Sequence, residues 1–162
     1  MSERVQKTPD GKIQYYVMEG KLIFPSINVP NFKFKKEGLW ETYLIPNDPE
    51  ELEVAKKIGI KTKKWDDIPE AIYLKRYTTL KNGQGNRPVN VKDADGNPFL
   101  FQDESGREVV VGNNTDAKVM YHYWNTTNSY GTFHTYILDG VRIQNLVEKQ
   151  DGTASIEEAL DF

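Results

Sequence analysis

The chain has 162 residues, of which 38% are hydrophobic and 28% charged, and a formal net charge of −3; these values fit one globular domain and exclude a disordered chain. No segment approaches the roughly 18 consecutive apolar residues of a membrane-spanning helix, and the N-terminal residues lack the apolar stretch of a signal peptide. Cysteine is absent, which excludes disulfides and thiolate metal sites, so we expect a cytoplasmic protein without a membrane partner.

Three segments before residue 46 have the composition of β-strands: KLIF at 21–24, NFKFKK at 31–36 and LWETYLI at 39–45. We expect Pro25 to end the first strand, because proline cannot donate a backbone hydrogen bond. The second segment alternates, which places Phe32 and Phe34 on one face and Lys33 and Lys35 on the other.

The periodicity then changes to that of a helix, which we place at about 49–58. Asp48 is a typical N-cap residue and Pro49 suits the first helical position. Apolar residues recur at three-residue spacing, and Gly59 is a suitable residue to end the helix.

Strand patterns return after the helix. Residues 71–78 alternate between aliphatic side chains on one face and Tyr73, Lys75 and Tyr77 on the other, and the glycine-rich stretch 81–88 is typical of a long loop. The remaining elements are a turn at 93–98, a short buried strand at 109–112, a hairpin with arms at 118–124 and 131–138, and a strand at 141–144. Many short strands with one helix predict a mainly β protein, a small closed or partly open barrel.

The end of the chain differs in charge from the rest. Residues 151–162 carry four carboxylates and no Lys or Arg, so residues 1–150 have a net charge of +1. We therefore expect a domain over 1–150 and an acidic tail over 151–162, which would be attracted to any basic groove on the domain. A tail that is simply solvated is the alternative interpretation.

Catalysis has little support in the sequence. His122 and His134 lie on the two arms of the predicted hairpin and could form a metal site with Asp116, but ordinary strand positions explain both histidines. Asp93 and Asp95 resemble the start of a calcium loop, although a hairpin turn suits Pro98 better. No phosphate-binding loop and no Ser or Cys nucleophile motif is present, so we expect neither an enzyme nor a cofactor.

Aromatic residues interleave with cations along the predicted strands. Single-stranded nucleic acid binds to such surfaces, because bases stack on the rings at about 1–3 kcal/mol each and cations contact the phosphates. The candidate binding residues are Lys33, Lys35, Trp40, Tyr43, Tyr73, Lys75, Arg76, Tyr77, Lys81, Arg87, Tyr121, Tyr123 and Trp124. Tyrosine also packs well in strands, and for Tyr121 and Tyr123 burial is an equally good interpretation.

Several stretches, taken in order, resemble the single-stranded DNA-binding proteins of tailed bacteriophages. They are LWETYLIPND at 39–48, LKR at 74–76, DADGNP at 93–98, VGNNTDAKV at 111–119 and GVRIQNLVE at 140–148, followed by the acidic tail that ends in Phe162. The resemblance implies an OB-fold, a five-stranded barrel with extra strands or a hairpin, which coats single-stranded DNA in phage DNA replication, recombination and repair in the host cytoplasm.

The resemblance also implies a role for the tail. Its residues Glu157, Glu158, Leu160, Asp161 and Phe162 would dock on replication partners such as the phage DNA polymerase and helicase-primase. The tail would also compete with DNA for the basic groove. A homodimer is compatible with the sequence, which does not decide the oligomeric state. The alternative function is a carbohydrate-binding or virion β-barrel or β-sandwich module, in which the exposed rings stack on sugars.

Overall fold

The structure is a computed structural model that describes residues 5–7, 13–31, 38–80 and 82–149. The predicted tail lies outside these residues, as do residues 32–36 of the strand predicted at 31–36 and Lys81. The elements are β1 (Val5–Lys7), β2 (Gln14–Asn31), β3 (Leu39–Pro46), α1 (Pro49–Lys57), β4 (Thr62–Trp65), β5 (Ile68–Tyr77), β6 (Asn90–Lys92), β7 (Thr115–Asn128) and β8 (Gly131–Asn145).

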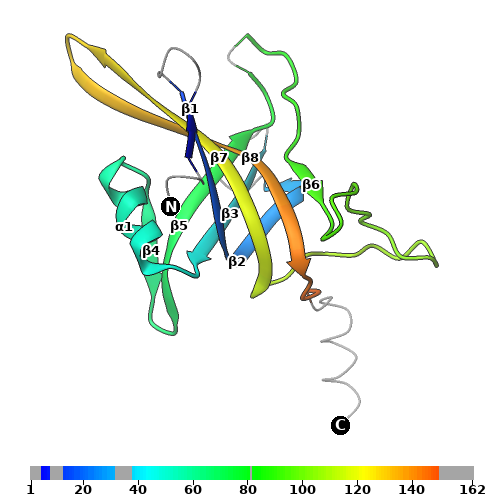
Figure 1. The fold of residues 1–162 in the computed structure, drawn as a ribbon. Coiled ribbons are helices and arrows are strands. Elements are labelled where there is room, and N and C mark those ends of the chain that lie inside the picture. Colours follow the sequence, from blue (N-terminus) through cyan, green and yellow to red (C-terminus); the bar gives the residue numbers. More distant parts are fainter. Residues whose placement is uncertain (1–4, 8–12, 32–37, 81, 150–162) are drawn as a thin grey trace.

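The strands form one curved sheet in the order β4-β5-β3-β2-β7-β8-β6, and β1 pairs with the start of β2 (Figure 1). All neighbours are antiparallel except β6, which runs parallel to β8. The helix α1 lies beside β4, and the hairpin of β7 and β8 projects beyond the sheet (Figure 1). The prediction of a mainly β, OB-fold-like protein with one short helix is confirmed.

The helix α1 forms where the sequence places its signals. The side chain of Asp48 accepts a hydrogen bond of 3.0 Å from the backbone N–H of Glu50, and Pro49 occupies the first turn. The chain leaves the helix at Ile58, and Gly59 follows with a φ of +85°, a left-handed conformation that glycine adopts without strain.

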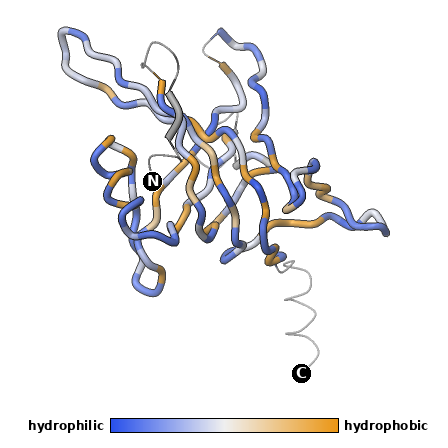
Figure 2. The backbone as a smooth tube through the Cα atoms, viewed as in Figure 1, coloured by the Kyte–Doolittle hydropathy of each residue, from blue (hydrophilic) through white to orange (hydrophobic). Residues whose placement is uncertain are grey.

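The core lies on the concave side of the sheet, where alternate residues of the long strands meet. Leu22 of β2, Leu44 of β3, Leu74 of β5, Val119 of β7 and Leu138 of β8 are fully buried there. In Figure 2 the hydrophobic segments concentrate where the strands cross the centre, and the projecting hairpin is mostly hydrophilic. The alternation predicted for residues 71–78 is confirmed in β5, because its aliphatic residues point into this core.

Three of the strand predictions are wrong. β2 is a single strand that begins at Gln14 and continues through Pro25, because a bulge with φ of +49° at Phe24 bends the chain there instead of ending the pairing. The predicted strand at 141–144 is the end of β8. The segment 109–112 contributes only an isolated bridge from Val111 to Glu148, although Val109 and Val111 are buried as expected.

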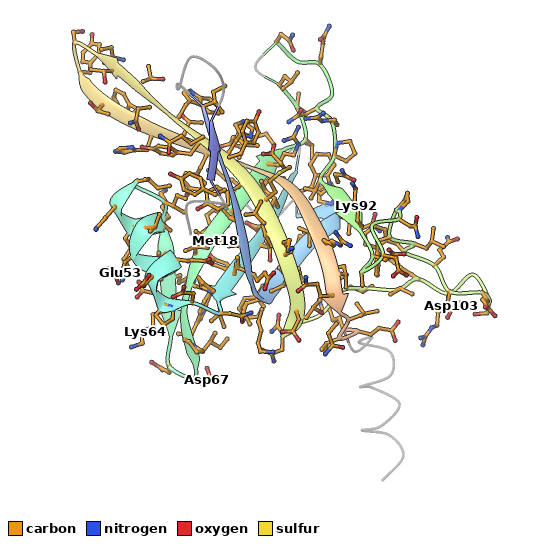
Figure 3. All side chains as sticks on the ribbon, in the orientation of Figure 1. Met18, Glu53, Lys64, Asp67, Lys92 and Asp103 are labelled. Carbon is orange, nitrogen blue, oxygen red and sulfur yellow. The ribbon has the colours of Figure 1, made fainter. Side chains whose placement is uncertain are left out.

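The segment between β6 and β7 extends away from the sheet, with Asp103 near its far end (Figure 3). The predicted turn at 93–98 is confirmed: the backbone N–H of Asp93 donates to the carbonyl of Asn97 over 2.8 Å. A second turn repeats the arrangement, because the backbone N–H of Asp103 donates to the carbonyl of Arg107 over 2.9 Å. The Asp103 carboxylate also accepts from the backbone N–H groups of Ser105 and Arg107, each over 2.9 Å.

The sheet does not close into a barrel, because β5 and β8 form no backbone ladder with each other in the described residues. Where β5 meets β8, the gap is bridged by the side chain of Arg76, whose Nη1 donates to the carbonyl of Leu138 over 3.3 Å and lies 3.4 Å from the carboxylate of Asp139. Its Nε donates to the carbonyl of Arg87 over 2.6 Å. We call this contact the Arg76 seam. Burial lowers the pKa of Arg76, and the nearby Asp139 opposes that shift, so the guanidinium stays charged.

Gly20 of β2 lies close to the backbone of β3, because a Cβ atom there would sit 2.1 Å from the carbonyl oxygen of Ile45. We expect Gly20→Ala to lower the free energy of unfolding by about 3 kcal/mol, since the clash involves backbone that must shift. Urea unfolding measures the change. The matched control is Gly85→Ala, where nothing lies within 4 Å and we expect a change within about 0.5 kcal/mol. Equal effects of the two substitutions would contradict the tight approach.

Candidate nucleic-acid interface

Four aromatic rings form a row of contacts on the outward side of β3, β4 and β5, and one of them, Phe24, comes from the neighbouring β2. Tyr43 and Tyr73 are directly paired across β3 and β5, with ring centroids 5.0 Å apart. Trp65 at the end of β4 lies edge-on to Tyr43 at 4.8 Å, and Phe24 lies edge-on to Trp65 at 5.6 Å. We call these four residues the β3–β5 aromatic cluster.

The β3–β5 aromatic cluster is accessible because strand alternation directs the neighbours of its tyrosines into the core. Leu44 follows Tyr43 and Ile72 precedes Tyr73, and both aliphatic side chains are fully buried. The cluster residues themselves remain partly exposed, and half of the surface of Phe24 is open to solvent. The result is a wide apolar and aromatic surface on a rigid pair of strands.

Two lysines accompany the rings. The Nζ atom of Lys63 lies 5.3 Å from the centre of the Trp65 ring, and that of Lys75 lies 5.2 Å from the centre of the Tyr77 ring. Tyr77 is 40% exposed and extends the surface along β5. Flat rings flanked by cations can stack on bases or sugars and attract an anion at the same time.

The hydroxyl of Tyr73 donates a hydrogen bond of 2.5 Å to Oε2 of Glu41. Burial raises the pKa of Tyr73 above its usual value, and the bond to Glu41 raises it further, so the phenol stays protonated. The bond fixes the ring beside Tyr43.

The predicted binding residues divide into three groups. Accessible to solvent, wholly or in part, are Tyr43, Tyr73, Lys75, Tyr77, Arg87 and Trp124. Outside the described residues are Lys33, Lys35 and Lys81. Buried, and therefore not placed to stack on a base or contact a phosphate in this structure, are Trp40, Arg76, Tyr121 and Tyr123.

Each buried residue has a structural partner. Tyr121 stacks on Tyr16 inside the sheet, with centroids 5.3 Å apart. Trp40 donates from Nε1 to the carbonyl of Asn28 over 3.2 Å. Tyr123 contacts His134, and Arg76 holds the seam described above. These four side chains pack inside the protein in this structure, and their part in binding stays a prediction.

The metal site considered in the sequence is not assembled. His122 Nδ1 lies 2.7 Å from the Asp139 carboxylate, His134 Nδ1 lies 2.6 Å from the Tyr123 hydroxyl, and Asp116 pairs with Lys21 at 2.9 Å. In the part of the chain that the structure describes, no group of three metal-binding side chains comes together.

The sequence interpretation missed Trp65 and Phe24. A signal for Trp65 was present, because Lys63 and Trp65 repeat the spacing of cation and ring that marks Lys75 and Tyr77. The sequence contains no such signal for Phe24, because the outward position of this residue depends on the bulge in β2.

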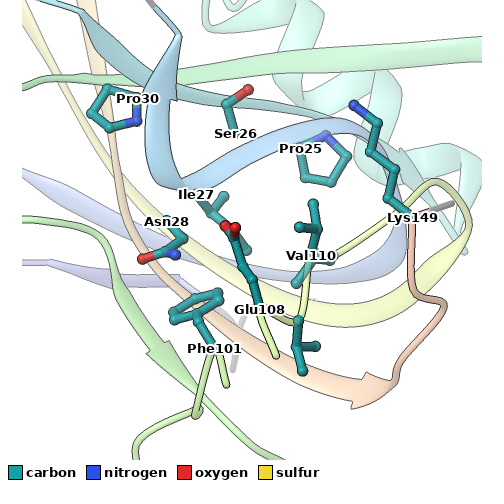
Figure 4. A pocket seen from close by; sticks show the side chains of 11 residues that line it. Pro25, Ser26, Ile27, Asn28, Pro30, Phe101, Glu108, Val110 and Lys149 are labelled. Carbon is teal, nitrogen blue, oxygen red and sulfur yellow. The ribbon is translucent and has the colours of Figure 1, made fainter. Parts of the chain in front are cut away.

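A pocket of about 330 Å³ lies on another part of the molecule, between the bend of β2 and the segment that leads to β7 (Figure 4). Pro25, Ile27 and Phe101 line it, and its charged lining residues in the described chain are Glu108 and Lys149.

No family model matches this sequence, and no curated protein is significantly similar to it. Solved structures do match. Gp2.5, a single-stranded DNA-binding protein encoded by bacteriophage T7, superposes with a TM-score of 0.60 at 15% identity, over 90% of this chain and 94% of that one. The fold is that of phage single-stranded DNA-binding proteins.

The single-stranded DNA-binding protein from bacteriophage Enc34 has the same fold. It matches 98% of this chain and 94% of its own, with a TM-score of 0.51 at 14% identity. The same protein in complex with single-stranded DNA matches with a TM-score of 0.50, over 91% of this chain and 92% of that one. These matches confirm, for the fold, the resemblance seen in the sequence. Among the described residues, no helix has the length and apolar character needed to cross a membrane.

Proposed function

We propose that this protein binds single-stranded DNA without strong sequence preference, through the β3–β5 aromatic cluster and the lysines beside it. The observation that carries the proposal is the row of four touching, partly exposed rings with Lys63 and Lys75 at its margins. Every base has a stackable face, so a surface of rings binds single strands with little regard to sequence.

The position of the cluster supports the same function. Counting β2, β3, β5, β7 and β8 as the five strands of an OB-fold makes β3 and β5 the second and third, and OB-folds bind oligonucleotides on the face of these two strands. The likeness in fold to phage single-stranded DNA-binding proteins supports the binding of single-stranded DNA.

The wider role that we propose is non-catalytic coating of single-stranded DNA during phage replication, recombination or repair in the host cytoplasm. The acidic tail, residues 151–162, would recruit the phage DNA polymerase and helicase-primase and compete with DNA for the body of the protein. Its carboxylates resemble phosphates in charge, and the tether keeps its effective concentration high.

The test is binding of a fluorescent dT oligonucleotide at several salt concentrations, for the full chain and for a truncation that ends at Gln150. We expect affinity to fall steeply with salt and to rise on truncation. Lys63→Ala and Lys75→Ala should each reduce the slope of log K against log salt by about 0.7 per lost phosphate contact. Lys57→Ala, an exposed lysine at the end of α1, is the matched control and should leave the slope unchanged.

Binding that does not respond to salt would contradict a phosphate contact and favour the carbohydrate-binding alternative. Absence of binding by both forms would reject the proposed function. Equal affinity of the full chain and the truncation would reject only the competition by the tail and would leave DNA binding by the protein standing.

A further inference from the structure

A second group of rings lies on β2 and β7, at the end of the sheet from which the hairpin projects. Tyr15 and His122 are paired across the two strands, with ring centroids 5.5 Å apart. His122 stacks on Trp124, with centroids 5.4 Å apart and only 13° between the planes. We call these three residues the β2–β7 ring stack, and all three side chains are partly exposed.

A hydrogen-bonded contact with Asp139 fixes the orientation of His122, the central ring of the stack. His122 Nδ1 lies 2.7 Å from the carboxylate of Asp139, and that carboxylate is paired with the buried Arg76. The negative charge that would otherwise repel a phosphate here is therefore balanced by a cation from the interior. Trp124 ends the row, and among the described rings only His122 lies against it.

A groove of about 570 Å³ adjoins the stack. Tyr15, His122 and Asp139 form one part of its lining, and Arg87, Asn90 and Phe101 form another. The side chain of Arg87 is exposed and pairs with no carboxylate of the described chain. Its backbone is anchored, because its carbonyl accepts the 2.6 Å hydrogen bond from Arg76. The lining of the groove thus combines rings with an exposed cation whose backbone is held in place.

The two ring groups are separate sites. Along β2, Tyr15 and Phe24 are nine residues apart, which corresponds to about 30 Å of strand. No ring contact in the described chain joins one group to the other. A short oligonucleotide held at one group would therefore leave the other free, and a longer one would have to cross the sheet to reach both.

We propose that the β2–β7 ring stack and its groove form a second binding site for single-stranded nucleic acid, in which a base stacks on Trp124 and a phosphate faces Arg87. The inference rests on the proposed function and extends it: one copy of the protein holds one strand at two places. Because the second contact is made within a complex already formed, affinity rises in a second step as the oligonucleotide lengthens.

The tryptophans of the chain allow a direct test. Trp65 belongs to the first site, Trp124 to the second, and Trp40 is buried in the core. In Trp65→Phe, a change of fluorescence on adding DNA reports on Trp124; in Trp124→Phe it reports on Trp65. Phenylalanine keeps a ring at each position, so both variants retain a stacking surface.

We expect a dT oligonucleotide of about 16 nucleotides, the upper range for one OB-fold, to quench the fluorescence of both variants. Adding Arg87→Ala to Trp65→Phe should raise the oligonucleotide concentration needed for quenching several-fold. Tyr130→Ala, an 89% exposed ring at the hairpin tip outside both groups, is the matched control and should have no such effect.

Quenching in Trp124→Phe but not in Trp65→Phe would overturn the second site and leave the proposed function standing. If Arg87→Ala left the oligonucleotide concentration needed to quench Trp124 unchanged, the phosphate contact in the groove would be overturned. Failure of the unmodified protein to bind the oligonucleotide would overturn the proposed function and this inference with it.

Discussion

Trp65→Ala is expected to weaken the binding of a dT oligonucleotide by about 10- to 100-fold. A base stacked on an aromatic side chain contributes about 1–3 kcal/mol, and 1.4 kcal/mol corresponds to a factor of ten in affinity. Trp65 is central to the β3–β5 aromatic cluster, since it contacts both Tyr43 and Phe24 and lies under the ammonium group of Lys63. Its removal takes away one stacking face and also frees its neighbours to move.

Fluorescence anisotropy of a labelled oligonucleotide at low salt measures the change. Trp65→Phe keeps a ring and should retain most of the affinity. Tyr130→Ala removes a comparable ring from an exposed position that contacts neither ring group, and should change the affinity less than twofold. Thermal unfolding of each variant shows that the fold is intact. Equal affinities of Trp65→Ala and Tyr130→Ala would move the binding surface away from β4.

Asp139→Asn is expected to lower the free energy of unfolding by about 3 kcal/mol. Arg76 and Asp139 expose only 7% and 9% of their side chains, so the substitution leaves a buried guanidinium without its counter-charge. The carbonyls of Arg87 and Leu138 still accept hydrogen bonds from it but bring no net charge. Urea unfolding followed by circular dichroism measures the loss.

The matched control is Asp116→Asn, which breaks an ion pair with Lys21 whose members are 35% and 47% exposed. An exposed pair contributes at most about 1 kcal/mol. A double variant, Arg76→Met with Asp139→Asn, should be less destabilised than the sum of the two single changes, because no charge is left buried. If Asp139→Asn proved as mild as Asp116→Asn, the Arg76 seam would not be what joins β5 to β8.

Alternation in the sequence shows which residues share a face, and composition shows which face is inside only where the two faces differ. On β5 aliphatic residues alternate with tyrosine and lysine, so the outward face was predicted correctly. On β7 both faces carry rings: Tyr121 and Tyr123 are buried, and His122 and Trp124 face outward. Only the pairing of β7 with β2 and β8 decides between them.

Arg76 shows the same limit for a charged residue. Its charge and its position beside Lys75 indicate a phosphate contact, and burial of a guanidinium is rare unless a partner is present. The partner, Asp139, is more than sixty residues away in the sequence, and no local sequence pattern predicts the ion pair. The helix needed no such information, because its N-cap, first-turn proline and terminal glycine are all local signals.

The Arg76 seam joins β5 to β8 through the side chain of one guanidinium, where the described residues form no backbone ladder. The hydrogen bonds of Arg76 belong to one side chain, so the seam is engaged when they are made and released when they are broken. Arg76 also holds the carbonyl of Arg87, so a ligand that immobilises Arg87 stabilises the engaged form as well. By thermodynamic linkage, a ligand bound in the groove raises the free energy of unfolding. Above the dissociation constant, the increase grows with the logarithm of the ligand concentration.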